Sequence, residues 1–226
     1  MFFKQLFHKE TSTYTYLIAD EETKECLLID PVKEDVDSYL KQIKELGFNL
    51  KYVLDTHVHA DHITGSGELH LKTGCETVLY EGANVKCISC PVVDGQELDL
   101  GSIKVKAIHT PGHTDHHLSY LIKNMIFTGD ALLIGGCGRT DFQSGSAKDL
   151  WVSLTEKLFK LPDDTLVYPA HDYHNKHVST ILQEKQTNPR LKDQTRDGFV
   201  ELMDNLNLPD PKYIKIAVPA NEKCGL

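Results

Sequence analysis

The chain has 226 residues, of which 40% are hydrophobic and 25% are charged, and its mean hydropathy is −0.32. These values are typical of a globular protein with a substantial buried core and exclude a largely disordered chain. The net charge of −9 and the pI near 5.7 argue against nucleic-acid and anionic-membrane partners, because both require basic patches. No apolar run approaches the ~18 residues that indicate a membrane span.

Strand-like and helix-like segments alternate along the chain, without a linker or an internal repeat, so we expect one domain over residues 1–226. The predicted strands, with a tight hairpin at Asn124, are 2–7, 14–20, 25–30, 51–55, 77–80, 103–108, 118–122, 125–128 and 165–168. The predicted helices are 35–46, 62–73, 147–160, 177–187 and 195–205.

The N-terminal MFFKQLFHKE has a short apolar stretch that Lys4 interrupts, and no small-residue cleavage site follows it. This pattern is not that of a secretory signal peptide, so we expect a cytoplasmic protein. Six cysteines are too few for a disulfide scaffold in a chain of this length, and we expect reduced thiols. Cys87 and Cys90 form CISC, but a second pair and a thioredoxin-like context are missing, which favours incidental thiols over a redox centre.

Metal-ligating side chains are concentrated in four segments: THVHADH at 56–62, PGHTDHH at 111–117, TGDAL at 128–132 and PAHDY at 169–173. Imidazole and carboxylate groups bind first-row transition metals. Each segment follows a predicted strand, and loops at strand ends can hold side chains around a common point. Gly112 and Gly129 precede two of the candidates, where we expect a tight turn or a close approach of the backbone to its neighbours. The sequence therefore predicts a metal site built from His57, His59, Asp61, His62, His113, Asp130 and His171.

The same four segments resemble those of the metallo-β-lactamase fold, an α/β sandwich of two mixed β-sheets flanked by helices (αββα). Longer runs resemble the persulfide dioxygenases related to the human ethylmalonic encephalopathy protein, and the resemblance covers nearly the whole chain. The runs that carry this resemblance are HITGSGEL after the first cluster, FTGDALLIGGCGRTDF at 127–142, YPAHDYH at 168–174, NPRL at 188–191 and AVPAN at 217–221. The resemblance implies oxidation of glutathione persulfide with O2 to glutathione and sulfite at a mononuclear non-haem iron, one Fe(II) per chain.

His57, His113 and Asp130 match the iron ligands of that family. Two histidines and one carboxylate leave open positions on Fe(II), so that O2 and a substrate sulfur can both bind. The resemblance then makes the other four candidates, His59, Asp61, His62 and His171, neighbours of the ligands or holders of water.

Two other functions are weighed against the persulfide dioxygenase. In hydrolases of this fold those four residues bind a second metal, so a glyoxalase II-like binuclear hydrolase of S-lactoylglutathione is the rival enzyme. That family typically continues its GCGK or GCGR turn with an aromatic and Glu-rich stretch, whereas this chain continues with Thr140, Asp141 and Phe142. A non-catalytic metal-binding protein of the same fold would show loss of ligand positions, and none is lost here.

Arg139 and Tyr173 match positions that contact glutathione or the metal pocket in both enzyme families. A guanidinium can hold a glutathione carboxylate through two hydrogen bonds, and the Tyr173 hydroxyl would reach a metal-bound ligand in a catalytic role. The alternatives are an ion pair of Arg139 with Asp141 and a buried tyrosine that anchors its loop. His116, His117, His174 and His177 are expected to be bystanders. The resemblance suggests a homodimer, and nothing in the sequence excludes a monomer.

Overall fold

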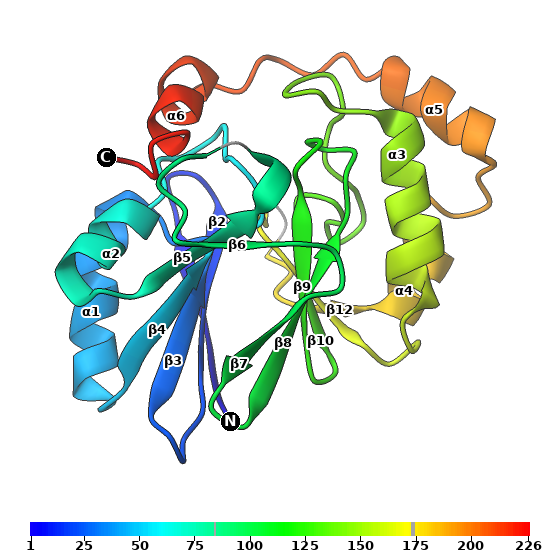
Figure 1. Ribbon diagram of the computed structural model, residues 1–226. Helices are drawn as coiled ribbons and strands as arrows, with labels where there is room; N and C mark the ends of the chain where they lie inside the picture. Colours follow the sequence, from blue (N-terminus) through cyan, green and yellow to red (C-terminus); the bar gives the residue numbers. More distant parts are fainter. Residues whose placement is uncertain (84, 173–174) are drawn as a thin grey trace.

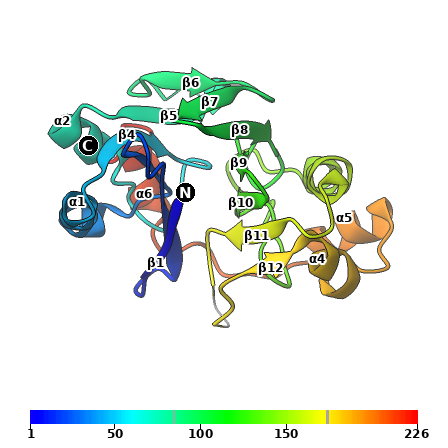
Figure 2. The same ribbon diagram turned by 90° about the horizontal axis from the view of Figure 1, so that it is seen from below.

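The computed structural model describes residues 1–83, 85–172 and 175–226. Two mixed six-stranded sheets pack face to face, and helices cover their outer faces (Figures 1 and 2). The first sheet has the order β1 (Phe2–His8), β2 (Thr13–Ala19), β3 (Glu25–Ile29), β4 (Asn49–Leu54), β5 (Glu76–Tyr80) and β6 (Cys90–Val92). Its first three strands are antiparallel, and β3 to β6 run parallel to one another.

The second sheet has the order β12 (Ser179–Thr180), β11 (Leu166–Pro169), β10 (Met125–Gly129), β9 (Leu118–Ile122), β8 (Ile103–His109) and β7 (Glu97–Leu100). Only β10 and β11 are parallel neighbours in it. Apolar residues alternate with lysines along β8, so that Ile103, Val105 and Ala107 face the core. Between the sheets, the rings of Tyr16 and Tyr168 pack on that of Phe127, with centroid distances of 4.8 Å and 5.4 Å.

Helices α1 (Val36–Glu45) and α2 (Ser66–Thr73) pack on the outer face of the first sheet. Helices α3 (Ala147–Val152), α4 (Ile181–Thr187) and α5 (Arg196–Asp204) pack on the second. The short helical turns are η1 (Lys33–Asp35), η2 (Glu81–Ala83), η3 (Ser153–Lys157) and η4 (Leu158–Lys160), and α6 (Ile214–Asn221) lies near the C-terminus. The predicted αββα sandwich is confirmed. No helix in the described ranges is long and apolar enough to span a bilayer.

Several predicted bounds are wrong for local reasons. The helix expected at 62–73 begins only at Ser66, because residues 62–64 are held in a loop by backbone contacts with Asn221. The helix expected at 177–187 begins at Ile181, since Ser179–Thr180 pair with β11 and Thr180 caps the helix. Strands β6 and β7 and helix α6 were not predicted, because their short sequences carry little periodicity.

The prediction that all six cysteines are reduced thiols is also wrong. Cys87 and Cys224 form a disulfide, and the other four, Cys26, Cys75, Cys90 and Cys137, are free. The two partners are 137 residues apart, so neither the CISC spacing nor the cysteine count indicates that they meet. They meet because α6 docks beside the loop that follows β4 (Figure 1).

Candidate metal centre

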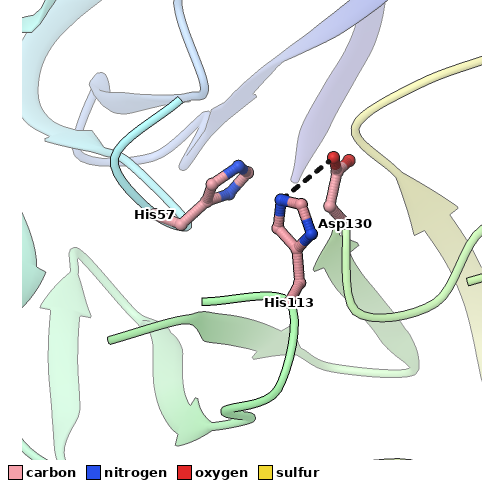
Figure 3. Close-up of side chains that lie close together, drawn as sticks. All are labelled: His57, His113 and Asp130. Carbon is pink, nitrogen blue, oxygen red and sulfur yellow. Dashed lines mark ion pairs between the residues drawn. The ribbon is translucent and has the colours of Figure 1, made fainter. Parts of the chain in front are cut away.

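The predicted ligand segments meet where strands of both sheets end. His57 follows β4, His113 follows β8, and Asp130 comes directly after β10. Figure 3 shows the three side chains turned toward one another. One ligand atom from each lies within 4.8 Å of the others, and His113 Nε2 is 3.5 Å from Asp130 Oδ2. The structure therefore brings together two imidazoles and one carboxylate from three loops.

Two atoms of this set are buried without a hydrogen-bond partner among the described residues: His57 Nε2 and Asp130 Oδ1. Such atoms are rare in folded proteins, because burial removes their bonds to water. His113 Nδ1 donates to the Arg139 carbonyl oxygen at 2.8 Å, which leaves the lone pair on Nε2. A cation between these atoms would satisfy all three residues, so the donor set fits Fe(II).

Burial favours the ligand form of His57. Burial, followed by the neighbouring His59 and His113, holds the pKa of His57 well below its usual range. The imidazole is therefore neutral near pH 7, as a metal ligand must be. On its other side, Nδ1 lies 3.0 Å from Thr56 Oγ1, which fixes the ring orientation.

A second group lies beside the first: His59, Asp61 and His62 also have ligand atoms within 4.8 Å of one another. His59 Nδ1 and His62 Nε2 are buried without a hydrogen-bond partner, and His62 Nδ1 lies 2.9 Å from Asp61 Oδ2. His171 Nε2 lies 3.4 Å from Asp61 Oδ2 and 3.6 Å from Asp130 Oδ1, between the two groups. The structure thus brings together the residues for a one-metal site and also those for a two-metal site.

His117 is not a bystander, contrary to the sequence-based expectation. Its ring stacks on that of His57, with centroids 5.1 Å apart, and its Nε2 accepts a hydrogen bond from the Asp130 N–H at 3.1 Å. Burial, and then the neighbouring His113, hold the pKa of His117 well below its usual range, so the ring stays a neutral acceptor. Its Nδ1 bonds Thr110 Oγ1 at 2.9 Å. His117 therefore fixes both a histidine and the carboxylate of the ligand set.

The other histidines set aside have varied positions. His116 Nε2 accepts from the Val58 N–H at 3.1 Å and so supports the loop after β4, which was also missed. His177 Nδ1 lies 2.9 Å from the hydroxyl of Tyr14. His174 and the predicted catalytic residue Tyr173 lie outside the described residues.

Asp30 is a further residue that the sequence did not reveal. It is buried at the end of β3, accepts from the Thr56 N–H at 2.7 Å, and lies 3.0 Å from His59 Nε2. Burial lowers the pKa of His59, but the Asp30 carboxylate, together with Asp61 and Asp55, outweighs burial and raises it to about 9. The ECLLID segment showed only an acidic residue after a strand, which is a weak signal by itself.

Gly129 has the close contacts that the sequence predicted. It has a φ of +49°, and a Cβ there would lie 2.6 Å from both Thr56 Oγ1 and His117 Nε2. A side chain at this position would displace the neighbours that orient Asp130.

The ligand set lines a cavity of about 640 Å³. Its walls are the loop 133–139, Arg190 and the segment 208–213, with Glu10 and Asp172 also in the lining. A cavity of this size accommodates a molecule as large as a tripeptide conjugate.

Arg139 lines this cavity and pairs with Asp141 through two hydrogen bonds of 2.6 Å and 2.7 Å. Its Nη1 donates to the Pro209 carbonyl oxygen at 2.7 Å. The guanidinium therefore ties the turn 138–142 to the wall segment 208–213. The ion pair considered as the alternative for Arg139 is present, and contact with a substrate stays a prediction.

Comparison with known proteins agrees with the fold. The profile described as "Metallo-beta-lactamase superfamily" matches residues 8–86 and 91–171. The mitochondrial persulfide dioxygenase ETHE1 of Homo sapiens is 47% identical over 226 residues, covering 99% of this chain and 88% of the human protein. A probable hydroxyacylglutathione hydrolase of Schizosaccharomyces pombe is 32% identical, with 88% of each chain covered.

Among solved structures, ETHE1 from Myxococcus xanthus superposes with a TM-score of 0.98 and 51% sequence identity, and all of both chains is covered. The chain therefore belongs to the metallo-β-lactamase superfamily and, within it, to the family of the ETHE1 persulfide dioxygenases.

The contact between His117 and Asp130 yields a prediction. His117→Ala leaves the Asp130 N–H without its acceptor, so we expect metal affinity to fall about 10- to 100-fold, as for other residues that orient metal ligands. Iron binding followed by competition with a chelator measures this. His117→Gln, whose amide oxygen can accept the same bond, should recover part of the affinity.

His70→Ala is the matched control, because His70 bonds the Cys75 carbonyl oxygen and is not part of the cavity lining. Unchanged metal affinity in folded His117→Ala would show that Asp130 is oriented by other contacts.

Proposed function

We propose that this protein is a persulfide dioxygenase that oxidises glutathione persulfide with O2 to glutathione and sulfite, using one Fe(II) per chain. The observation that carries the proposal is the set of His57, His113 and Asp130, with its buried unpaired ligand atoms, in a chain 47% identical to a persulfide dioxygenase. The reaction balances when one water is consumed, because sulfite needs a third oxygen beyond the two of O2.

His57, His113 and Asp130 would hold the iron. Bound iron supplies a centre at which O2 and the persulfide sulfur are brought together and activated. The single carboxylate of the set leaves one positive charge uncompensated, which favours an anionic persulfide. The protein's contribution is orientation: His117 and Thr56 fix the ligands, and His59, Asp61, His62 and His171 are the proposed holders of the water that the reaction consumes.

The cavity supports a carrier of the size and charge of glutathione. The chain has a net charge of −9, so an anionic substrate requires local basic groups. Arg139, Arg190 and Lys212 supply them along the cavity wall. Arg139 and Tyr173 are the proposed substrate contacts, and Tyr173 also the proposed catalytic hydroxyl.

The rival proposal is a binuclear hydrolase of S-lactoylglutathione. One specific observation favours it: the ligand atoms of His59, Asp61 and His62 also converge. The higher identity to a persulfide dioxygenase than to a hydroxyacylglutathione hydrolase favours the oxidative reaction. A cytoplasmic location and a homodimer stay predictions.

The first test is the reaction itself. Iron-loaded protein given glutathione persulfide should consume about one O2 for each sulfite released, as the balanced reaction requires. An oxygen electrode and sulfite quantification measure the two amounts, with S-lactoylglutathione as the control substrate. Hydrolysis of the control without O2 uptake from the persulfide would refute the dioxygenase and support the hydrolase.

The role of Arg139 can be separated from that of its ion pair. If the guanidinium holds a carboxylate of the carrier, Arg139→Ala should raise KM about 10-fold or more with a smaller fall in kcat, because such binding is lost equally from ground and transition states. Asp141→Asn removes the charge of the partner but keeps Arg139, and its KM should change by less than about 3-fold.

Steady-state kinetics of both variants show whether Arg139 contacts the substrate or acts only through its ion pair. Equal increases in KM would show that Arg139 acts through Asp141 and the cavity wall, without contacting the substrate.

A further inference from the structure

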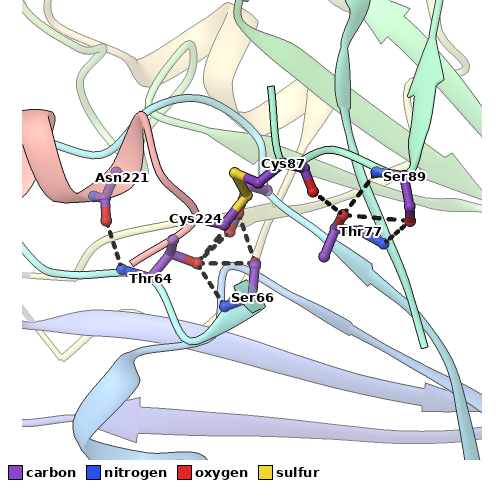
Figure 4. The surroundings of a disulfide bond; sticks show 8 residues. Thr64, Ser66, Thr77, Cys87, Ser89, Asn221 and Cys224 are labelled. Carbon is purple, nitrogen blue, oxygen red and sulfur yellow. Dashed lines mark hydrogen bonds between the residues drawn. A yellow bond between two sulfur atoms is a disulfide. The ribbon is translucent and has the colours of Figure 1, made fainter. Parts of the chain in front are cut away.

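The disulfide Cys87–Cys224 joins two segments that are otherwise distant in the chain. Cys87 lies between η2 and β6 at the edge of the first sheet, and Cys224 follows α6, with a Cα–Cα distance of 6.2 Å. Figure 4 shows the bond beside Thr64 and Ser66, which follow the histidine-rich loop. The bond therefore attaches the C-terminal helix close to the metal centre.

The residue that links α6 to the metal centre is Asn221, three positions before Cys224. Its Nδ2 donates to the carbonyl oxygens of His59 and His62, at 2.8 Å each. Its Oδ1 accepts from the Thr64 N–H at 2.9 Å. One buried amide thus holds both ends of the loop 59–64, which carries His59, Asp61 and His62.

Helix α6 has few other anchors. It is eight residues long, below the ~12–15 residues at which an isolated helix is marginally stable in water. Only Ala217 and Asn221 of the helix are buried, while Ile216 is 64% exposed. Beyond the helix, Cys224 O accepts from the Gly67 N–H at 2.9 Å, and Lys33 Nζ donates to Gly225 O. The disulfide closes a long stretch of chain, so it restricts the undocked state strongly.

The bond is open to exchange from one side. Cys87 is partly exposed, whereas Cys224 is buried. The exposed Lys86 and Lys223 directly precede the two cysteines, and their positive charges attract thiolates and persulfide anions. Of the two cysteines, Cys87 is therefore the one that we expect a nucleophile to attack, with Cys224 as the leaving thiolate.

We propose that Cys87–Cys224 is a thiol–persulfide exchange site that controls how firmly α6 holds the loop 59–64 beside the metal centre. A low-molecular-weight thiolate attacks Cys87 Sγ and releases Cys224 as a thiolate; a second thiolate then releases Cys87. The thiols leave as their own disulfide, and the two electrons remain on the protein cysteines. This reductive half does not depend on the proposed function.

The oxidative half rests on the proposed substrate. The Cys87 thiolate takes the terminal sulfur of a persulfide, whose carrier leaves as a thiolate. The Cys224 thiolate then attacks the inner sulfur of the Cys87 persulfide, forms the disulfide and expels hydrosulfide. One persulfide and two protein thiolates give one disulfide, one carrier thiolate and one hydrosulfide. Abundant persulfide therefore docks α6, and accumulated thiol product releases it.

The test uses full-length iron-loaded protein without O2, so that no dioxygenation occurs. Glutathione should reduce Cys87–Cys224 and speed amide hydrogen exchange in residues 59–67 and 214–226 about 10-fold or more. Glutathione persulfide should then restore the disulfide, with release of about one sulfide per chain, and slow the exchange again. Cys90→Ser, which removes the nearby free thiol, is the matched control and should behave like the wild type.

Cys87→Ser should exchange rapidly and respond to neither reagent. Asn221→Ala, which keeps the disulfide, should speed exchange in residues 59–67 whether or not the bond is reduced, since the connecting hydrogen bonds are gone. Unchanged amide hydrogen exchange in residues 59–67 of reduced wild-type protein would overturn the link between the disulfide and the loop 59–64. Failure of the persulfide to close the bond would overturn the exchange site, independently of whether the aerated enzyme oxidises persulfide.

Discussion

Buried, unpaired ligand atoms are the constraint on which this structure depends. His57 Nε2 and Asp130 Oδ1 lie out of contact with solvent and have no hydrogen-bond donor or acceptor among the described residues. A fold tolerates such atoms only where they are needed, because each one costs about 1–3 kcal/mol when it is left unsatisfied. The surrounding residues hold these atoms together: His117 and Thr56 orient the first ligands, and Asp30 ties Thr56 to His59.

The two sheets explain how such a site is assembled from residues far apart in the sequence. The candidate ligands follow β4, β8 and β10, and His171 follows β11, so the rigid sandwich fixes where each loop begins. Sequence patterns were enough to predict that these segments lie at strand ends, because each of them directly follows a run of β-forming residues. They were also enough for the αββα architecture, through resemblance to a family with long shared runs.

Residues that act through tertiary contacts could not be predicted. His117 lies next to His116 in a histidine-rich segment, and only the fold shows that its ring faces Asp130 N and His57. Asp30 and Asn221 act through backbone groups of the loop after β4, which no spacing reveals. The disulfide of Cys87 and Cys224 is not predictable from the sequence, because the two residues meet only when α6 docks. The loop after β4 is therefore supported from the end of β3 on one side and from the C-terminal helix on the other.

Two groups of candidate ligands lie side by side, so the fold alone is compatible with one or two metal ions. The number of metal ions per chain therefore distinguishes the oxidative enzyme from the hydrolytic one. Metal per chain, measured by plasma mass spectrometry in wild-type protein, Asp130→Ala and His62→Ala, tests this most directly. The mononuclear account predicts about one iron per chain in the wild type, loss of iron in Asp130→Ala and retention in His62→Ala with affinity or rate reduced about 10- to 100-fold. Two metals in the wild type and one in His62→Ala would contradict it.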